Sequence, residues 1–194
     1  MTDLMQLRSV SFDTSFLLKE DSRVGKVIDD LARDRIPCFI TATVASELER
    51  LHAGGRISES LYKQAMKRWI HSKATVINFK NRLLSDTFGQ ACMRSMESYG
   101  INPDHVINDC TILVSVLKNG IGLFLSEDFH FTSPITREVI AELKHAACTE
   151  YHLMCATTLY SVDTRTFLEA YQHGSIDLDI VRARQHVRET KEND

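Results

Sequence analysis

The stretch DHVINDCTILVSVLKNGIGLFLSED, residues 104–128, decides the fold. Its first part, 104–120, is apolar on nearly all sides, which predicts a buried helix that is capped by Asp104 and ends at Gly120. Its second part, 121–128, is rich in large apolar residues and predicts a strand. A helix that leads directly into a buried strand is typical of a parallel α/β sheet.

The rest of the chain repeats this alternation. Hydrophobic periodicity and turn residues predict strands at 6–12, 36–41, 74–78, 121–128 and within 151–161. The predicted helices are 21–35, 41–55, 58–73, 81–100, 104–120, 134–150 and 164–174. We therefore expect a three-layer α/β/α sandwich with a central parallel sheet. The expected domain spans residues 1–174, and a helical or flexible C-terminal tail follows at 175–194.

Composition restricts the classes of function. A net charge of -3 excludes nucleic-acid binding through bulk charge, so a polyanionic partner would need a local basic patch. The start MTDLMQLRSV lacks the features of a signal peptide, and no run reaches the ~18 apolar residues of a membrane span. We expect no membrane partner and a cytoplasmic location. The chain has five cysteines and no CxxC pair, which predicts buried free thiols in a reducing compartment and argues against a zinc site.

Four acidic residues lie at positions where burial would favour an apolar residue. Asp13 and Asp128 end predicted strands, and Glu47 lies beside the apolar stripe of the helix that follows strand 36–41. Asp109 lies in the first turns of the buried helix. In open α/β sheets the ligand crevice lies beyond the carboxyl ends of the strands. Each acid also has a structural explanation, as a helix cap, a turn residue, a solvated side chain or a partner of the helix dipole.

Taken together, the four acids predict a metal site. Carboxylates that converge at one edge of a sheet repel each other unless a cation neutralises them. Hard oxygen ligands select Mg²⁺ or Mn²⁺. Such an ion can activate water and stabilise the charge that develops on a phosphodiester. We therefore expect Asp13, Glu47, Asp109 and Asp128 to be both the metal ligands and the catalytic residues.

Four segments are similar, in order and context, to the pattern of the PIN-domain family. They are SFDTSFLL (11–18), TVASELERL (43–51), NDCTILVSVLKNG (108–120) and LFLSEDFHF (123–131). The family includes the ribonuclease toxins of prokaryotic toxin–antitoxin pairs and RNA-processing nucleases, and the resemblance covers residues 8–170.

The resemblance implies a divalent-metal-dependent ribonuclease that hydrolyses single-stranded RNA. It implies the same four acids as metal ligands, with Thr14, Ser15 and Ser126 as supporting polar residues. It also implies an antitoxin protein as a partner if the chain is a toxin, and a homodimer by analogy with compact members. The extra length of the chain separates it from the compact toxins.

An acidic site needs cations nearby to hold RNA. Lys63 and Lys67 lie four residues apart on the predicted helix 58–73 and are candidates for phosphate contacts, although a solvated face is the alternative. The aromatic candidates for base stacking are Tyr62, Trp69 and Phe129, with a core position as the alternative for Trp69. The eight histidines show no triad or zinc spacing, and we expect no catalytic role for them. The rival function is a non-catalytic PIN-like module that binds RNA or a protein.

Overall fold

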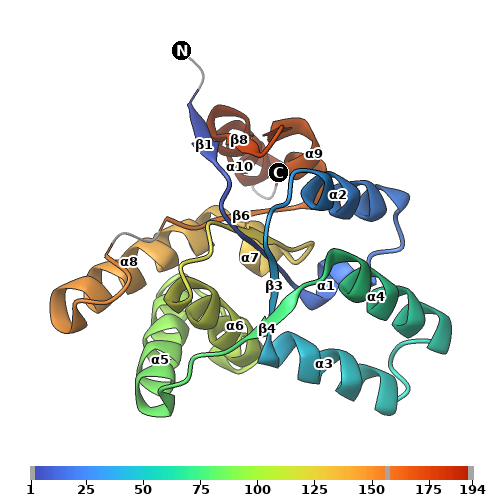
Figure 1. Ribbon diagram of the computed structural model, residues 1–194. Coiled ribbons are helices and arrows are strands. Elements are labelled where there is room, and N and C mark those ends of the chain that lie inside the picture. Colours follow the sequence, from blue (N-terminus) through green and yellow to red (C-terminus); the bar gives the residue numbers. More distant parts are fainter. Residues whose placement is uncertain (1–2, 156–157, 192–194) are drawn as a thin grey trace.

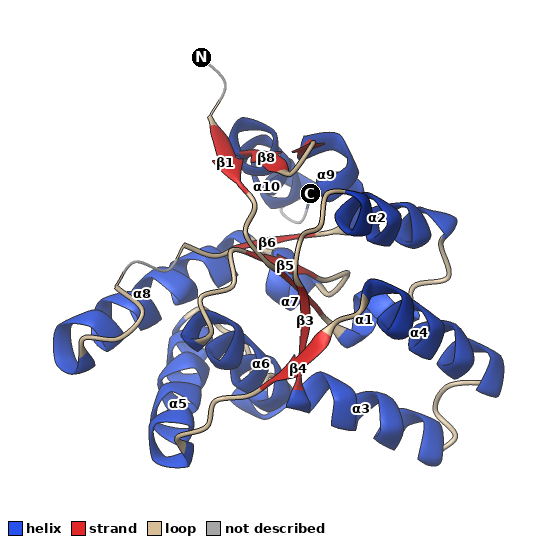
Figure 2. Ribbon diagram, in the orientation of Figure 1, coloured by secondary structure: helices blue, strands red, loops and turns tan. Residues whose placement is uncertain are grey.

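The computed structural model describes residues 3–155 and 158–191, with side chains as far as residue 184 of the last helix. Its centre is a parallel five-stranded sheet with the order β4-β3-β2-β5-β6. The strands are β2 (Val10–Phe12), β3 (Cys38–Thr41), β4 (Thr75–Ile77), β5 (Leu123–Leu125) and β6 (Tyr160–Val162). Figure 2 shows these strands in the middle of the molecule, with helices on either side.

The helices form two layers around the sheet. They are α1 (Thr14–Leu18), α2 (Ser22–Arg33), α3 (Ala42–Ala53), α4 (Glu59–Ser72), α5 (Arg82–Ser98), α6 (Ile107–Lys118), α7 (Phe129–Thr132), α8 (Pro134–Tyr151), α9 (Thr164–Ala170) and α10 (Leu178–Lys191), with a 3-10 turn, η1 (Pro103–His105). Helix α5 packs against α6 and α8, whereas α4 packs against α1 and α2 (Figure 1). The predicted α/β/α sandwich is thereby confirmed. No helix in the described part of the chain is long and apolar enough to cross a bilayer.

A second, antiparallel sheet joins the two ends of the chain. Its order is β1-β8-β7, with β1 (Leu4–Gln6), β7 (Tyr171–Gln172) and β8 (Ser175–Asp177). The single strand predicted at 6–12 is therefore wrong, because β1 and β2 belong to different sheets. The first residues of the predicted tail pack on the domain, since Ile176 and Val181 are fully buried. The packed unit thus extends beyond residue 174, and residues 192–194 lie outside the described chain.

Two short helices and one helix start differ from the sequence-based expectation. Helices α1 and α7 have five and four residues and begin directly after Asp13 and Asp128, whose carboxylates accept backbone N–H groups of the first turn. Such short helices show no hydrophobic periodicity. Asp104 does not cap the buried helix: it lies in η1, and α6 begins at Ile107 without a side-chain cap.

The prediction of free thiols is wrong for four of the five cysteines. Cys92 on α5 and Cys110 on α6 form a disulfide, with their Cα atoms 5.6 Å apart. Cys148 and Cys155 form a second one near the end of α8, with a Cα separation of 4.9 Å. Cys38 alone is free among the described residues, and burial raises the pKa of its thiol to about 12. The first pairing follows from the packing of α5 on α6, which the spacing of cysteines in the sequence does not reveal.

Candidate metal centre

Strand register brings several polar residues to one edge of the sheet. Phe12 on β2 is level with Ile40 on β3 and Leu125 on β5, and Leu125 is level with Val162 on β6. The residues that follow these positions therefore lie at the same edge, and they are Asp13, Thr41, Ser126 and Asp163. The chain runs outward from β2 through β3 to β4 and then returns to β5 on the other side of β2. The edge between β2 and β5 is thus a topological switch point, where α/β sheets bind ligands.

Asp13 is a buried carboxylate at this switch point, with only 4 % of its surface exposed. Its Oδ2 accepts hydrogen bonds from Ser15 Oγ at 2.6 Å, from Ser126 Oγ at 2.9 Å and from the Ser15 backbone N–H at 3.3 Å. These three hydrogen bonds all go to the same oxygen, Oδ2. Burial raises the pKa of Asp13 above its ordinary value, although these hydrogen bonds lower it.

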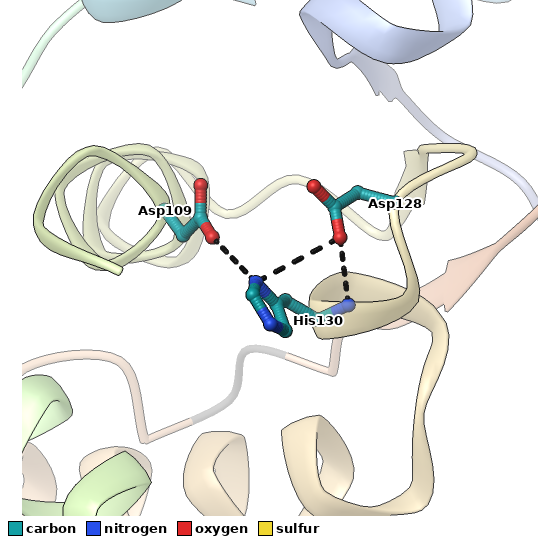
Figure 3. Close-up of side chains that lie close together, drawn as sticks. All are labelled: Asp109, Asp128 and His130. Atoms are coloured by element: carbon teal, nitrogen blue, oxygen red, sulfur yellow. Dashed lines mark hydrogen bonds and ion pairs between the residues drawn. The ribbon is translucent and has the colours of Figure 1, made fainter. Parts of the chain in front are cut away.

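Asp109, Asp128 and His130 form the tightest cluster of ligating groups in the described chain, with their ligand atoms within 4.8 Å of one another. Figure 3 shows the ring of His130 between the two carboxylates. His130 Nδ1 lies 3.3 Å from Asp109 Oδ2 and 3.8 Å from Asp128 Oδ1. The His130 backbone N–H also donates to Asp128 Oδ1 over 2.8 Å. The sequence assigned no role to this histidine; the signal it offered is its position two residues after Asp128, at the start of a helix.

The electrostatics of Asp109 connect this cluster to Asp13. The pKa of Asp109 is raised to about 7. Burial is the largest cause and the nearby charges of Asp128 and Asp13 act in the same direction, whereas His130 opposes the rise. The negative charges of Asp128 and Asp13 are therefore close enough to oppose the ionisation of Asp109. A divalent cation among them would remove this opposition, which makes the arrangement suitable for a metal.

Ser126 fixes the distance between the two strand ends. Its hydroxyl donates to Asp13 Oδ2 and accepts the backbone N–H of Asp128 at 3.0 Å. Ser15 Oγ lies 3.1 Å from Ser126 Oγ and accepts the backbone N–H of Glu127 at 2.9 Å. Both serines thus bind the segments that carry Asp13 and Asp128, which is the position expected of supporting residues.

Glu47 lies apart from the tight cluster. Its Oε2 accepts a hydrogen bond from Thr14 Oγ1 at 2.5 Å, and its Oε1 lies 3.8 Å from Arg50 Nη2. It also lines an open cavity of about 330 Å³, together with Asn108, the neighbour of Asp109. The hydroxyl of Thr14 therefore binds Glu47. Glu47, the fourth predicted acid, is not part of the cluster of Asp109, Asp128 and His130 and lies at the rim of the site.

The remaining acid of this loop, Glu127, has a structural role. Its carboxylate forms an ion pair with Lys19 at 2.6 Å and accepts the backbone N–H and the hydroxyl of Thr164. It therefore holds the loop after β5 against the start of α9.

The predicted RNA contacts are distributed over two elements. Lys63 and Lys67 are exposed on α4, and Lys63 pairs with Glu59 at 3.1 Å. Trp69 is half-buried and donates its ring N–H to Ala74 O, so it anchors α4. Phe129 lies between Asp128 and His130 in the sequence and is 40 % exposed.

No protein-family model matches the chain, and no curated protein matches it.

Proposed function

We propose that the protein is a divalent-metal-dependent ribonuclease that hydrolyses phosphodiester bonds of single-stranded RNA. The observation that carries the proposal is the convergence of Asp13, Asp109 and Asp128 at the switch point of a parallel sheet, where the pKa of Asp109 is raised to about 7. The resemblance of four segments to PIN-domain nucleases supports the same assignment.

The donor set suits Mg²⁺ or Mn²⁺. Asp13, Asp109 and Asp128 offer carboxylate oxygens, the ligands that both ions accept, and Glu47 at the rim could reach the ion through an intervening water. When bound, such an ion would lower the pKa of a water molecule and neutralise charge on the phosphate.

Side chains of the protein would position the metal ligands and the attacking water. Ser15 and Ser126 hold Asp13 in one rotamer, and the buried helix α6 holds Asp109. The carboxylates of Asp109 and Asp128 accept hydrogen bonds from the attacking water and direct its oxygen at phosphorus. Attack by water breaks the bond to the 3′ oxygen and leaves a 5′-phosphate and a 3′-hydroxyl. The ribose 2′-hydroxyl takes no part.

The surroundings favour an unpaired strand. The exposed ring of Phe129 beside the acids can stack on a base only when that base is free of its duplex partner. Lys63 and Lys67 would hold phosphates further along the strand. In the same proposal the enzyme acts either as a toxin that an antitoxin protein neutralises or in RNA processing, and it pairs as a homodimer. A cytoplasmic location belongs to the same proposal, and the two disulfides, which are typical of oxidising compartments, are the observation that counts against it.

A non-catalytic PIN-like module that binds RNA or a protein is the second candidate. It is favoured by one observation, that Glu47 binds Thr14 and Arg50 and does not join the cluster. Such a module would bind RNA equally well with and without a divalent ion.

The experiment is cleavage of an end-labelled single-stranded RNA with Mg²⁺ or Mn²⁺, by the wild type and by D109N. D29N is the matched control, because Asp29 also faces a histidine, His71 at 2.8 Å, but on the surface. We expect wild type and D29N to leave 5′-phosphate ends, and D109N to be slower by roughly 100-fold or more, since even outer partners of a metal site contribute 10–100-fold. Cyclic phosphate ends, or full activity in excess EDTA, contradict the proposal.

A further inference from the structure

His130 Nδ1 lies where a ligand of the same ion would lie. Neighbouring ligands of an octahedral ion with bonds of ~2.1 Å are ~3 Å apart, and opposite ligands are ~4 Å apart. His130 Nδ1 is 3.3 Å from Asp109 Oδ2 and 3.8 Å from Asp128 Oδ1. Both distances fall within the range for ligand atoms that share one ion.

The position of the ring is fixed by the start of α7. Asp128 caps this helix and accepts the backbone N–H of His130 at 2.8 Å, so the residue is tied to one of the two acids by its own main chain. In Figure 3, Nδ1 faces the carboxylates of Asp109 and Asp128, and the other ring nitrogen points away from them. The lone pair of a neutral ring with its proton on the outer nitrogen is thus directed at the centre of the cluster.

We infer that His130 is a nitrogen ligand of this metal centre and makes it prefer Mn²⁺ over Mg²⁺. The inference rests on the proposed metal site. Mg²⁺ prefers oxygen donors and gives up its waters reluctantly, whereas imidazole binds transition-metal ions better. A site of carboxylates alone discriminates less between the two ions, so the histidine accounts for the selectivity.

If His130 is not a metal ligand, its removal should change the metal affinity in the opposite direction. If the ring only neutralises the two acids as an imidazolium, it competes with any metal ion, and its removal should strengthen the binding of Mn²⁺ and Mg²⁺ alike. The two roles are therefore separated by the direction of the change in affinity.

The test measures Mn²⁺ binding to the full chain by the loss of the free-ion electron paramagnetic resonance signal, with Mg²⁺ as competitor. H130A removes the ring, and H130N replaces it with an amide that can offer oxygen. H71A is the matched control, because His71 Nε2 also lies 2.8 Å from an aspartate oxygen but faces only one acid. Circular dichroism of each variant checks folding.

We expect H130A to bind Mn²⁺ about 10–100-fold more weakly and Mg²⁺ by less than about 3-fold, so that the preference for Mn²⁺ collapses. H130N should move the preference toward Mg²⁺, and H71A should change neither affinity. An unchanged preference in H130A, or tighter binding of both ions, overturns the role of His130 and leaves the nuclease proposal standing. Equal Mn²⁺ binding by wild type and D109N, or none by wild type, removes the metal site itself and the inference with it.

Discussion

Ser126 Oγ donates a hydrogen bond to Asp13 Oδ2 over 2.9 Å, and this bond joins the ends of β2 and β5 across 113 residues of sequence. The same hydroxyl accepts the backbone N–H of Asp128 at 3.0 Å. Ser126 is fully buried, so water cannot replace it in either bond. One hydroxyl group therefore links two of the acids of the proposed metal centre.

Replacement of this serine, Ser126→Ala, should weaken both the fold and the metal centre. We expect the free energy of unfolding to fall by about 1–3 kcal/mol, because buried polar partners are left unpaired. Mn²⁺ affinity should fall about 10-fold, as for other outer partners of metal ligands. Urea unfolding and a Mn²⁺ titration measure the two effects. S175A, which removes an exposed hydrogen bond to Gln6, is the control. Unchanged Mn²⁺ affinity in S126A would show that the hydroxyl does not position the acids.

The stability of the metal-free protein should fall as the pH rises from about 4 to about 7. The pKa of Asp109 is raised from 3.8 to about 7 in the folded state, so in this window the folded protein binds more protons than the unfolded chain. Between pH 5 and pH 8 about two pH units lie below the folded pKa, which corresponds to a loss on the order of 2–3 kcal/mol. Urea unfolding in EDTA at pH 5 and pH 8 measures the loss.

Two comparisons test the origin of this pH dependence. D109N should flatten it, with a remainder from Asp13, whose pKa is also raised. Saturating Mn²⁺ should stabilise the protein more at pH 8 than at pH 5, because the ion binds the ionised carboxylates. Equal stability at the two pH values in EDTA would mean that the pKa of Asp109 is not raised in the folded protein.

Replacement of two neighbouring cationic residues of α4, Lys67 and Arg68, should affect stability very differently. Arg68 is buried and donates to the backbone carbonyls of Leu17, Lys19 and Asp21, at 2.7, 2.6 and 3.2 Å. R68M leaves these carbonyls without a partner and should cost about 2–3 kcal/mol of stability. Lys67 is exposed, so K67A should leave stability within about 0.5 kcal/mol.

Measurements of RNA affinity should distinguish the role of Lys67 from that of Arg68. K67A should weaken RNA binding and lower the slope of log affinity against log salt by about 1, the effect of one lost phosphate contact. R68M should keep the wild-type affinity in its folded fraction. Fluorescence anisotropy at several salt concentrations measures both. A K67A variant with wild-type affinity and slope would show that α4 does not contact RNA.

The oxidised protein should contain one titratable thiol. Cys38 is the free cysteine of the described chain, whereas Cys92–Cys110 and Cys148–Cys155 are paired. Thiol titration in guanidinium should therefore find one thiol before reduction and five after it. Reduction should also lower the free energy of unfolding, by about 3 kcal/mol for the 18-residue loop that the first disulfide closes. Five thiols in the oxidised protein, or unfolding unaffected by reduction, would exclude these bonds.

The fold was predictable because its signals are local. The apolar surface of 107–118 and the run Leu123–Leu125 identify a buried helix and strand without knowledge of their neighbours. Strand ends could likewise be located, and with them Asp13 and Asp128, whereas Asp109 follows from the start of the buried helix. By contrast, β1 and β8 have three residues each and pair across almost the whole chain, so no periodicity reveals them.

The parts of the site that were missed depend on tertiary structure. His130 reaches Asp109 only because a four-residue helix turns its ring back across the switch point. Glu47 was expected among the ligands because it lies near a buried stripe; the sequence did not reveal that its carboxylate accepts a hydrogen bond from Thr14. The direction of a side chain at the end of a strand depends on the loop that follows, and that information is not in the residue pattern.

The central claim is that Asp13, Asp109 and Asp128 hold one divalent centre. Crystals soaked in Mn²⁺ and measured at the manganese absorption edge test it most directly, with D109N crystals treated in the same way. The account predicts an anomalous peak that is bonded to Asp13, Asp109 and Asp128, and also to His130, and that is absent from D109N. A wild-type map without a peak there, or a peak that persists in D109N, contradicts it.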